Sequence, residues 1–104
     1  MRADTLRGHL DALVLATLRA GPLHGYAVID ALRGRSDGAF DLAEGTVYPV
    51  LHRLEVEGLL ASAWTTEAGR RRRVYRLTRA GTAALGKRRE DWRAFSRAVD
   101  AVLA

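Results

Sequence analysis

Hydrophobic and polar positions recur with a helical period at both ends of the chain and with a strand-like period between them. From Leu6 to Arg19 one face collects apolar side chains and a threonine at helical spacing, namely Leu6, Leu10, Leu13, Val14, Thr17 and Leu18. The stretch "AGP" at 20–22 ends this helix, because glycine supplies a turn and proline cannot continue the hydrogen-bond ladder. A shorter second helix is predicted in "LHGYAVIDALRG", ending at Gly34.

The third helical segment, "AEGTVYPVLHRLEVEG", has poor helix formers in its leading half. We predict a helix from about Ala43 to Glu57, with Gly58 well placed as its C-cap. Its core face should hold the residues that share one side of the helix, which are Val47, Val50, Leu51, Leu54 and Gly58. The opposite side carries Gly45, Pro49, His52, Arg53 and Val56, with Tyr48 on the flank. This outer face lacks the usual mixture of lysine and glutamate.

Pro49 leaves two arrangements of this helix open. Inside the helix it costs about 3 kcal/mol, less near the first turn, and it frees the carbonyl of Gly45 on the outer side. A helix that accepts this cost on an exposed face indicates a functional site. Alternatively, the helix begins late, near Tyr48, with Pro49 at its favoured first position. The local pattern favours neither arrangement.

Two strands and a final long helix complete the predicted order. The strands are Leu59 to Thr65 and Arg72 to Leu77, joined by a polar loop, "TEAGRR". Thr78 is a good N-cap for the last helix, which can run to Val102. The predicted fold class is therefore mainly α with a small β-hairpin.

An arginine cluster marks this hairpin. "GRRRRVYR" contains Arg70, Arg71, Arg72, Arg73 and Arg76, and alternation sends Tyr75 and Leu77 toward the core. A charge run is usually only a solvated surface. At the tip of a ribbon that follows an unusual helix, phosphate contact is the better interpretation, because such contacts dominate affinity for nucleic acids.

The last helix carries an apolar seam with heptad spacing, broken by Arg88. Its members are Leu85, Trp92, Phe95, Val99 and Val102. A helix of about 25 residues spans roughly 38 Å and outreaches so small a domain. We therefore predict a homodimer interface along this seam; the alternative is that the helix folds back on its own domain.

Charge and composition favour an acidic partner and exclude several function classes. The 104 residues suffice for one domain, the net charge is +5, and Lys87 is the only lysine among 17 basic residues. Codon bias toward arginine explains much of that choice, but not the clustering. Without cysteine, and with His9, His24 and His52 at no ligand-like spacing, we expect no metal, no cofactor and no enzymatic activity. No apolar run approaches a membrane span, so we expect a soluble, cytoplasmic protein.

The motifs together resemble the PadR family of bacterial transcriptional regulators. The resemblance rests on "GPLHGYAVIDAL", "EGTVYPVLHRLEVEGLL", "SAW", "GRRRRVYRLT" and "TRAG", and covers Leu10 to Gly81. It implies a winged helix-turn-helix over residues 1–78 and a C-terminal dimerisation helix over 79–104. The single short C-terminal helix resembles the smaller subfamily.

The resemblance also implies roles for particular residues. The family's recognition helix corresponds to Glu44–Glu57. Its threonine, tyrosine and proline match Thr46, Tyr48 and Pro49, and the basic residue after them matches Arg53. The wing's Gly-Arg pair matches Gly69 and Arg70. Some small-subfamily members bind flat aromatic drugs with a tryptophan of the last helix, which corresponds to Trp92. Plain dimer packing is an equally good role for that ring, and Trp64 is expected to anchor the wing to the core.

The residues and the resemblance together predict a sequence-specific, homodimeric repressor that binds an inverted-repeat DNA operator. The resemblance implies release by a small ligand, with an aromatic one as the candidate. Its expected DNA-binding residues are Thr46, Tyr48, Pro49, His52, Arg53, Arg70, Arg71 and Arg72. The alternative is a winged-helix module that binds protein or RNA and does not respond to a ligand.

Overall fold

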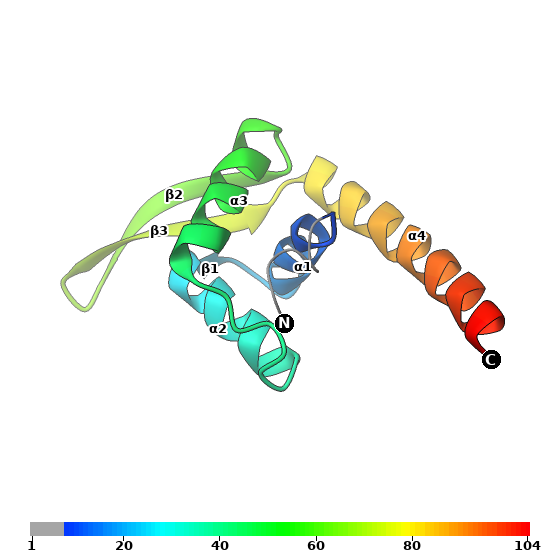
Figure 1. The fold of residues 1–104 in the computed structure, drawn as a ribbon. Coiled ribbons are helices and arrows are strands. Elements are labelled where there is room, and N and C mark those ends of the chain that lie inside the picture. Colours follow the sequence, from blue (N-terminus) through cyan, green and yellow to red (C-terminus); the bar gives the residue numbers. More distant parts are fainter. Residues whose placement is uncertain (1–7) are drawn as a thin grey trace.

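The computed structural model describes residues 8–104 and shows a helical body with a long β-hairpin on one side and a long helix on the other (Figure 1). The elements are α1 (Leu10–Thr17), β1 (Leu23–His24), α2 (Gly25–Arg35), α3 (Glu44–Val56), β2 (Leu60–Glu67), β3 (Arg70–Leu77) and α4 (Arg79–Leu103). This order confirms the predicted fold class. The helix predicted from Leu6 is seen from Leu10, and Leu6 itself lies outside the described residues.

The sheet differs from the prediction in two ways. The two residues of β1 pair antiparallel with β3, which gives the strand order β1-β3-β2. The predicted six-residue hairpin loop is wrong, because the strands pair as far as Glu67 opposite Arg70. Only Ala68 and Gly69 form the turn, with φ of 49° and 76°, as a two-residue hairpin turn requires. Across this polar ribbon Glu67 faces Arg70, and Thr65 and Thr66 face Arg72 and Arg71.

One hydrophobic core joins the three body helices, the roots of both long strands and the start of α4. Its buried members are Val14, Leu15, Leu18, Val28, Ile29, Leu32, Leu42, Val47, Leu51, Leu54, Leu60, Tyr75 and Leu85. The core face predicted for α3 is confirmed at its buried positions Val47, Leu51 and Leu54. Tyr75 is 1% exposed, as the alternation in β3 predicts.

The structure decides between the two arrangements of Pro49. Because α3 begins at Glu44, Pro49 lies inside the helix on its exposed side, and the late start near Tyr48 is wrong. Gly58 ends the helix with φ of 81°. The amide of Leu59 donates to the carbonyl of Leu54 at 2.9 Å, which is the six-to-one bond of a Schellman motif.

Thr78 fixes the start of α4 against the end of α3. Its hydroxyl accepts from the amide of Gly81 at 3.0 Å and donates to the carbonyl of Gly58 at 2.7 Å. The predicted N-cap is therefore confirmed. Gly81 lies so close to the backbone of Leu59 that a β-carbon at Gly81 would be 2.0 Å from the carbonyl oxygen of Leu59. The first turns of α4 thus share the core of the preceding elements, and the division predicted at Thr78 marks no break in packing.

Two glycines of α4 should respond oppositely to the same substitution. Gly81→Ala is expected to lower the free energy of unfolding by about 3 kcal/mol, because the added methyl overlaps backbone that cannot move aside cheaply. Gly86→Ala is its matched control, since nothing lies within 4 Å of a β-carbon at Gly86. There, alanine should raise the free energy of unfolding by up to about 1 kcal/mol. Urea titration of both variants measures the difference, and equal changes would contradict the tight junction.

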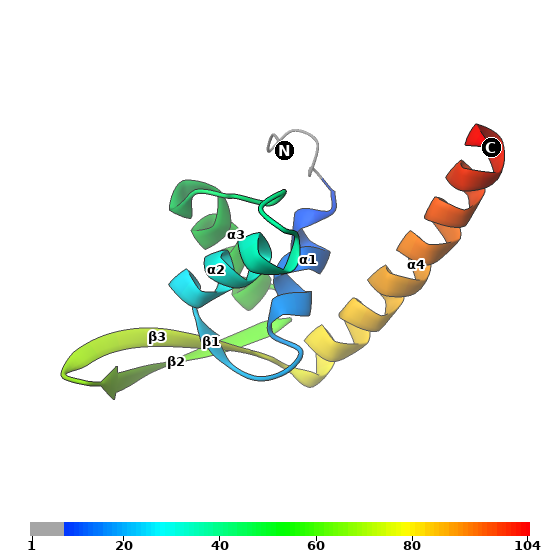
Figure 2. The ribbon, with the colours of Figure 1, turned by 90° about the horizontal axis from the view of Figure 1, so that it is seen from below.

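The C-terminal half of α4 extends away from the body (Figure 2). The radius of gyration is 14.7 Å, against about 13 Å for a compact chain of this length. No helix among residues 8–104 has the length and apolar character of a membrane span. Trp92, Phe95 and Val102 are exposed to 53%, 58% and 84%.

The structure corrects the role assigned to Leu85. This residue is only 4% exposed and belongs to the core of its own subunit, because it faces α1 within the first turns of α4. The dimer seam therefore stays a prediction for the remaining members, which are Trp92, Phe95, Val99 and Val102.

Candidate nucleic-acid interface

The outward face of α3 carries the side chains predicted to meet DNA. Gly45, Pro49, His52 and Arg53 are exposed, and Val56 is 88% exposed. Ala43, the N-cap residue, makes no side-chain capping bond, so the first turn has no protein side chain closing it. Glu44 lies in this first turn. The face is narrow and largely uncharged ahead of Arg53, a shape that suits insertion into a groove.

Arg53 is held by carboxylates of two elements. Its guanidinium donates to both oxygens of Asp11 on α1 and, at 3.1 Å, to Glu57 at the end of α3. These bonds, first of all those to Asp11, raise the pKa of Arg53 above its usual range. Arg88 of α4 lies 3.9 Å from the same Asp11. Asp11 therefore links the candidate reading helix to the C-terminal helix.

Tyr48 packs over the start of α2 instead of standing free. A β-carbon at Gly25 would lie 2.5 Å from its ring, so only glycine leaves room for the ring in this position. Burial, and then the charge of Glu44, raises the pKa of Tyr48, so the hydroxyl stays protonated and can donate a hydrogen bond. Tyr26, 55% exposed, stands beside it on α2.

The wing is an arginine-covered ribbon whose base is tied to α3. Arg73 donates to the hydroxyl of Ser62 at 2.8 Å and to Glu55 of α3 at 3.3 Å. Ser62 in turn donates to Glu55 at 2.7 Å. Arg70 and Arg71 are exposed beyond this anchor. The wing thus holds a fixed direction relative to α3 while its outer arginines face solvent.

Trp64 does not anchor the wing, contrary to the role that the resemblance implied. It is 56% exposed, and the guanidinium of Arg71 lies 4.8 Å from its ring centroid, with Arg73 at 5.7 Å. The reason is its place in the register, opposite Arg73 on the part of the ribbon that projects beyond the core. Cation–π contacts pre-position these arginines on the wing surface.

His24 joins the wing to α2. Its Nδ1 accepts from the amide of Ala27 at 3.2 Å and so caps α2. Its Nε2 lies 2.5 Å from a nitrogen of Arg72, so His24 also contacts the wing.

These groups border one hollow between the wing, β1 and α3. It has a volume of about 510 Å³ and is lined by His24, Gly25, Tyr26, Tyr48, Trp64, Arg70, Arg71, Arg72, Arg73 and Tyr75. The structure therefore brings Tyr48 of the candidate reading helix together with the predicted wing arginines, and adds Tyr26, His24 and Trp64. Tyr26 was not predicted as a member of the site, because its place beside Tyr48 depends on the packing of α3 against the start of α2.

Residues 14–87 match the model of the transcriptional regulator PadR-like family. The chain belongs to this family. Within it, transcriptional regulator Rv3488 of Mycobacterium tuberculosis is 48% identical over 60 residues, which cover 58% of this chain and 56% of that protein.

Solved PadR-type structures share the whole architecture. A PadR family regulator from Eggerthella lenta is 34% identical, with a TM-score of 0.81 over 96% of this chain and 86% of that one. A transcriptional regulator from Clostridium thermocellum gives a TM-score of 0.88 at 27% identity over 98% and 100% of the two chains. The PadR-like family consists of transcriptional regulators rather than enzymes, in line with the sequence prediction. The chain is thus a PadR-type transcriptional regulator with a winged helix-turn-helix fold.

The α4 seam of this PadR-type chain holds an aromatic cluster. The ring of Trp92 meets His9 edge-on at 5.3 Å and lies 6.0 Å from Phe95. His9 is exposed at the start of α1 and stands beside Trp92. In residues 8–104 no three histidine, aspartate or glutamate side chains are grouped as a metal site would need.

Proposed function

We propose that this PadR-type regulator is a homodimeric, sequence-specific DNA-binding repressor. The observation that carries the proposal is the pairing of a slim, exposed α3 face with an arginine-covered wing that is tied to the same helix through Glu55 and Ser62. A protein- or RNA-binding module would not need this fixed relation between a helix and a basic ribbon. DNA needs it, because a major groove and the adjacent backbone lie at a fixed spacing.

In this proposal α3 enters the major groove. Tyr48, Pro49 and His52 approach the base edges, and Thr46 with the open first turn of α3 contacts a phosphate. Arg53 exchanges Asp11 for DNA, and Arg88 beside the same carboxylate leaves Asp11 with a cationic partner. The wing, through Arg70, Arg71 and Arg72, contacts the flanking backbone.

The dimer forms along α4 through Trp92, Phe95, Val99 and Val102. Two reading helices then face successive major grooves about 34 Å apart on an inverted repeat. A flat aromatic ligand beside Trp92 would change their separation and release DNA. Repression follows from occupying a promoter. We further propose that the protein acts in the cytoplasm.

Footprinting on the DNA upstream of its own gene tests the proposal. A protected, two-fold symmetric site is expected on duplex DNA, with weaker binding to single strands and to RNA of the same sequence. Equal binding to all three would support the alternative of a general or RNA-binding module. Titration of a Trp64→Phe chain with chemically diverse aromatics, followed by the fluorescence of Trp92, tests ligand binding separately.

Gly25→Ala should weaken DNA binding without unfolding the protein. The new methyl overlaps the far end of the Tyr48 ring, which can swing away and lose its place on the reading face. The loss of one positioned contact predicts a roughly tenfold weaker operator affinity, measured by fluorescence anisotropy. Gly34→Ala in the same helix is the control, because nothing lies within 4 Å of a β-carbon there. Equal affinity of both variants would contradict a role for Tyr48.

A further inference from the structure

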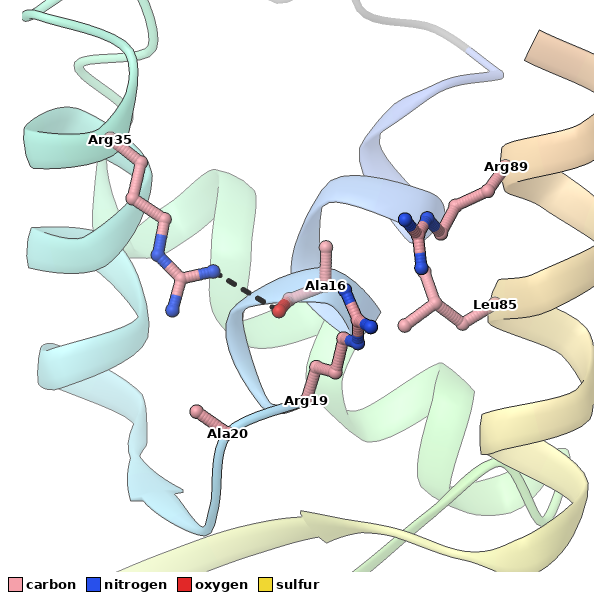
Figure 3. Close-up of a pocket in the computed structure, with 6 residues that line it drawn as sticks. All are labelled: Ala16, Arg19, Ala20, Arg35, Leu85 and Arg89. Carbon is pink, nitrogen blue, oxygen red and sulfur yellow. Dashed lines mark hydrogen bonds between the residues drawn. The ribbon is translucent and has the colours of Figure 1, made fainter. Parts of the chain in front are cut away.

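A second, separate cleft lies on the side of the molecule away from the wing, between α1, α2 and α4. Its volume is about 430 Å³, and it is lined by Ala16, Arg19, Ala20, Arg35, Leu85 and Arg89. Figure 3 shows the three arginine side chains reaching it from the end of α1, the end of α2 and α4. Cavities of this size suit small molecules.

The three guanidinium groups share the cleft without a carboxylate among its lining residues. Arg35 donates to the carbonyl of Ala16 at 3.1 Å, which holds its side chain across the gap toward α1. None of the ion pairs formed among residues 8–104 includes Arg19, Arg35 or Arg89. Three like charges from three helices repel one another unless an anion lies between them.

We propose that this cleft binds a small organic anion that carries two or more carboxylate or phosphate oxygens. Guanidinium forks match both groups with paired hydrogen bonds. Ala16, Ala20 and Leu85 supply an apolar wall for the carbon skeleton. A phosphorylated metabolite and a polycarboxylate share this chemistry, and the experiment below distinguishes them.

The cleft also gives the anion a regulatory role, a step that rests on the proposed DNA-binding function. Arg89 belongs to the dimerisation helix, whereas Arg19 and Arg35 belong to the body that carries α3. An anion held by both parts fixes the angle between them. In a dimer, that angle sets the distance between the two reading helices, so binding of the anion changes operator affinity.

Calorimetry on the full chain tests binding, with citrate and inorganic pyrophosphate as probes at matched ionic strength. One probe or both should bind, and the midpoint of thermal unfolding should rise with the concentration of the bound probe. Arg19→Gln and Arg89→Gln should each weaken binding roughly tenfold, because each removes a charge-assisted contact. Preference for citrate identifies a carboxylate ligand, and preference for pyrophosphate identifies a phosphate ligand.

Arg97→Gln is the matched control, because it removes the same charge from an exposed position of α4 outside the cleft. It should bind the probes like the parent chain. No binding of either probe, or equal loss in Arg97→Gln, overturns the proposal. A change of the monomer–dimer equilibrium in Arg89→Gln with unchanged probe binding also overturns it, because carboxylates of a second copy would then occupy the cleft.

Operator binding separates this inference from the proposed function. Without probe, Arg89→Gln should bind DNA like the parent chain; a tenfold loss would make the cleft part of the DNA surface and overturn the site. At a probe concentration that saturates the parent chain but not Arg89→Gln, the parent chain and Arg97→Gln should change their operator affinity, and Arg89→Gln should not. If the parent chain binds the probe but binds no DNA under any condition, the anion site stands and the proposed repressor function fails.

Discussion

A chain carrying Trp92→Asp and Phe95→Asp is expected to stay folded, to become monomeric and to bind a two-half-site operator roughly a thousandfold more weakly. Both rings are about half exposed in the single subunit, at 53% and 58%. Little of the subunit's own core is therefore lost. In the proposed dimer the same positions become an apolar seam, where buried and unpaired carboxylates are strongly disfavoured.

The size of the effect follows from the linkage of two half-sites. When one subunit is bound, the second binds as an intramolecular event, which raises affinity by about 10²–10⁴-fold without any new contact. A monomer loses this advantage while each reading helix keeps its own contacts. Sedimentation equilibrium measures the assembly, and anisotropy on operators with one and two half-sites measures affinity. Affinity for a single half-site should be unchanged.

Ala94→Asp combined with Ala101→Asp is the matched control. Both alanines are exposed, and rotation along α4 places them on the side away from the seam. The control adds the same two charges to the same helix and should remain dimeric. A dimeric Trp92/Phe95 variant would place the interface elsewhere. A monomeric variant with full operator affinity would contradict paired reading.

The elements of this fold could be predicted where a periodic pattern coincided with a cap. Thr78 and Gly58 are examples, because each is the residue type that its backbone position demands. As expected, Thr78 caps the start of α4, and Gly58 ends α3. The position of Pro49 could not be decided locally. Burial of Val47, Leu51 and Leu54 holds the first turns of α3 helical and offsets the cost of the proline.

The parts that the sequence did not predict depend on contacts between distant segments. β1 has only two residues, and its strand character comes entirely from pairing with Tyr75 and Val74. The wing is longer than expected, because a ribbon exposed on both sides shows no alternation of apolar and polar residues. Leu85 fits a heptad, but the same spacing also serves a helix that packs on its own subunit.

In the candidate site, too, the residue types could be predicted from the sequence, and the contacts between distant segments could not. The sequence indicated the residue types at the reading helix and the wing, and the structure gathers Tyr48 and the wing arginines around one hollow. Spacing alone could not show that Asp11 holds Arg53, since these residues are 42 positions apart. Nor could it show that Trp64 lies under Arg71 on an exposed ribbon instead of in the core.

Replacing Arg70 and Arg71 by glutamine is expected to weaken binding to every DNA sequence by roughly 50-fold at 0.1 M salt. Both side chains are exposed on the part of the wing beyond its anchor to α3, so the fold should be unaffected. Each phosphate contact releases a counterion and contributes about 0.9 to the slope of log affinity against log salt. Losing two contacts should therefore reduce the magnitude of this slope by about 1.8.

The discrimination between operator and unrelated DNA should change little in this variant, because phosphate contacts carry no sequence information directly. Arg93→Gln with Arg97→Gln is the matched control, since both lie exposed on α4 and their loss lowers the net charge by the same amount. Anisotropy titrations at several salt concentrations measure affinity and slope together. A slope reduced equally in both variants would mean that net charge, and not the wing, attracts DNA. An unchanged slope in the wing variant would remove the wing from the interface and leave α3 to bind alone.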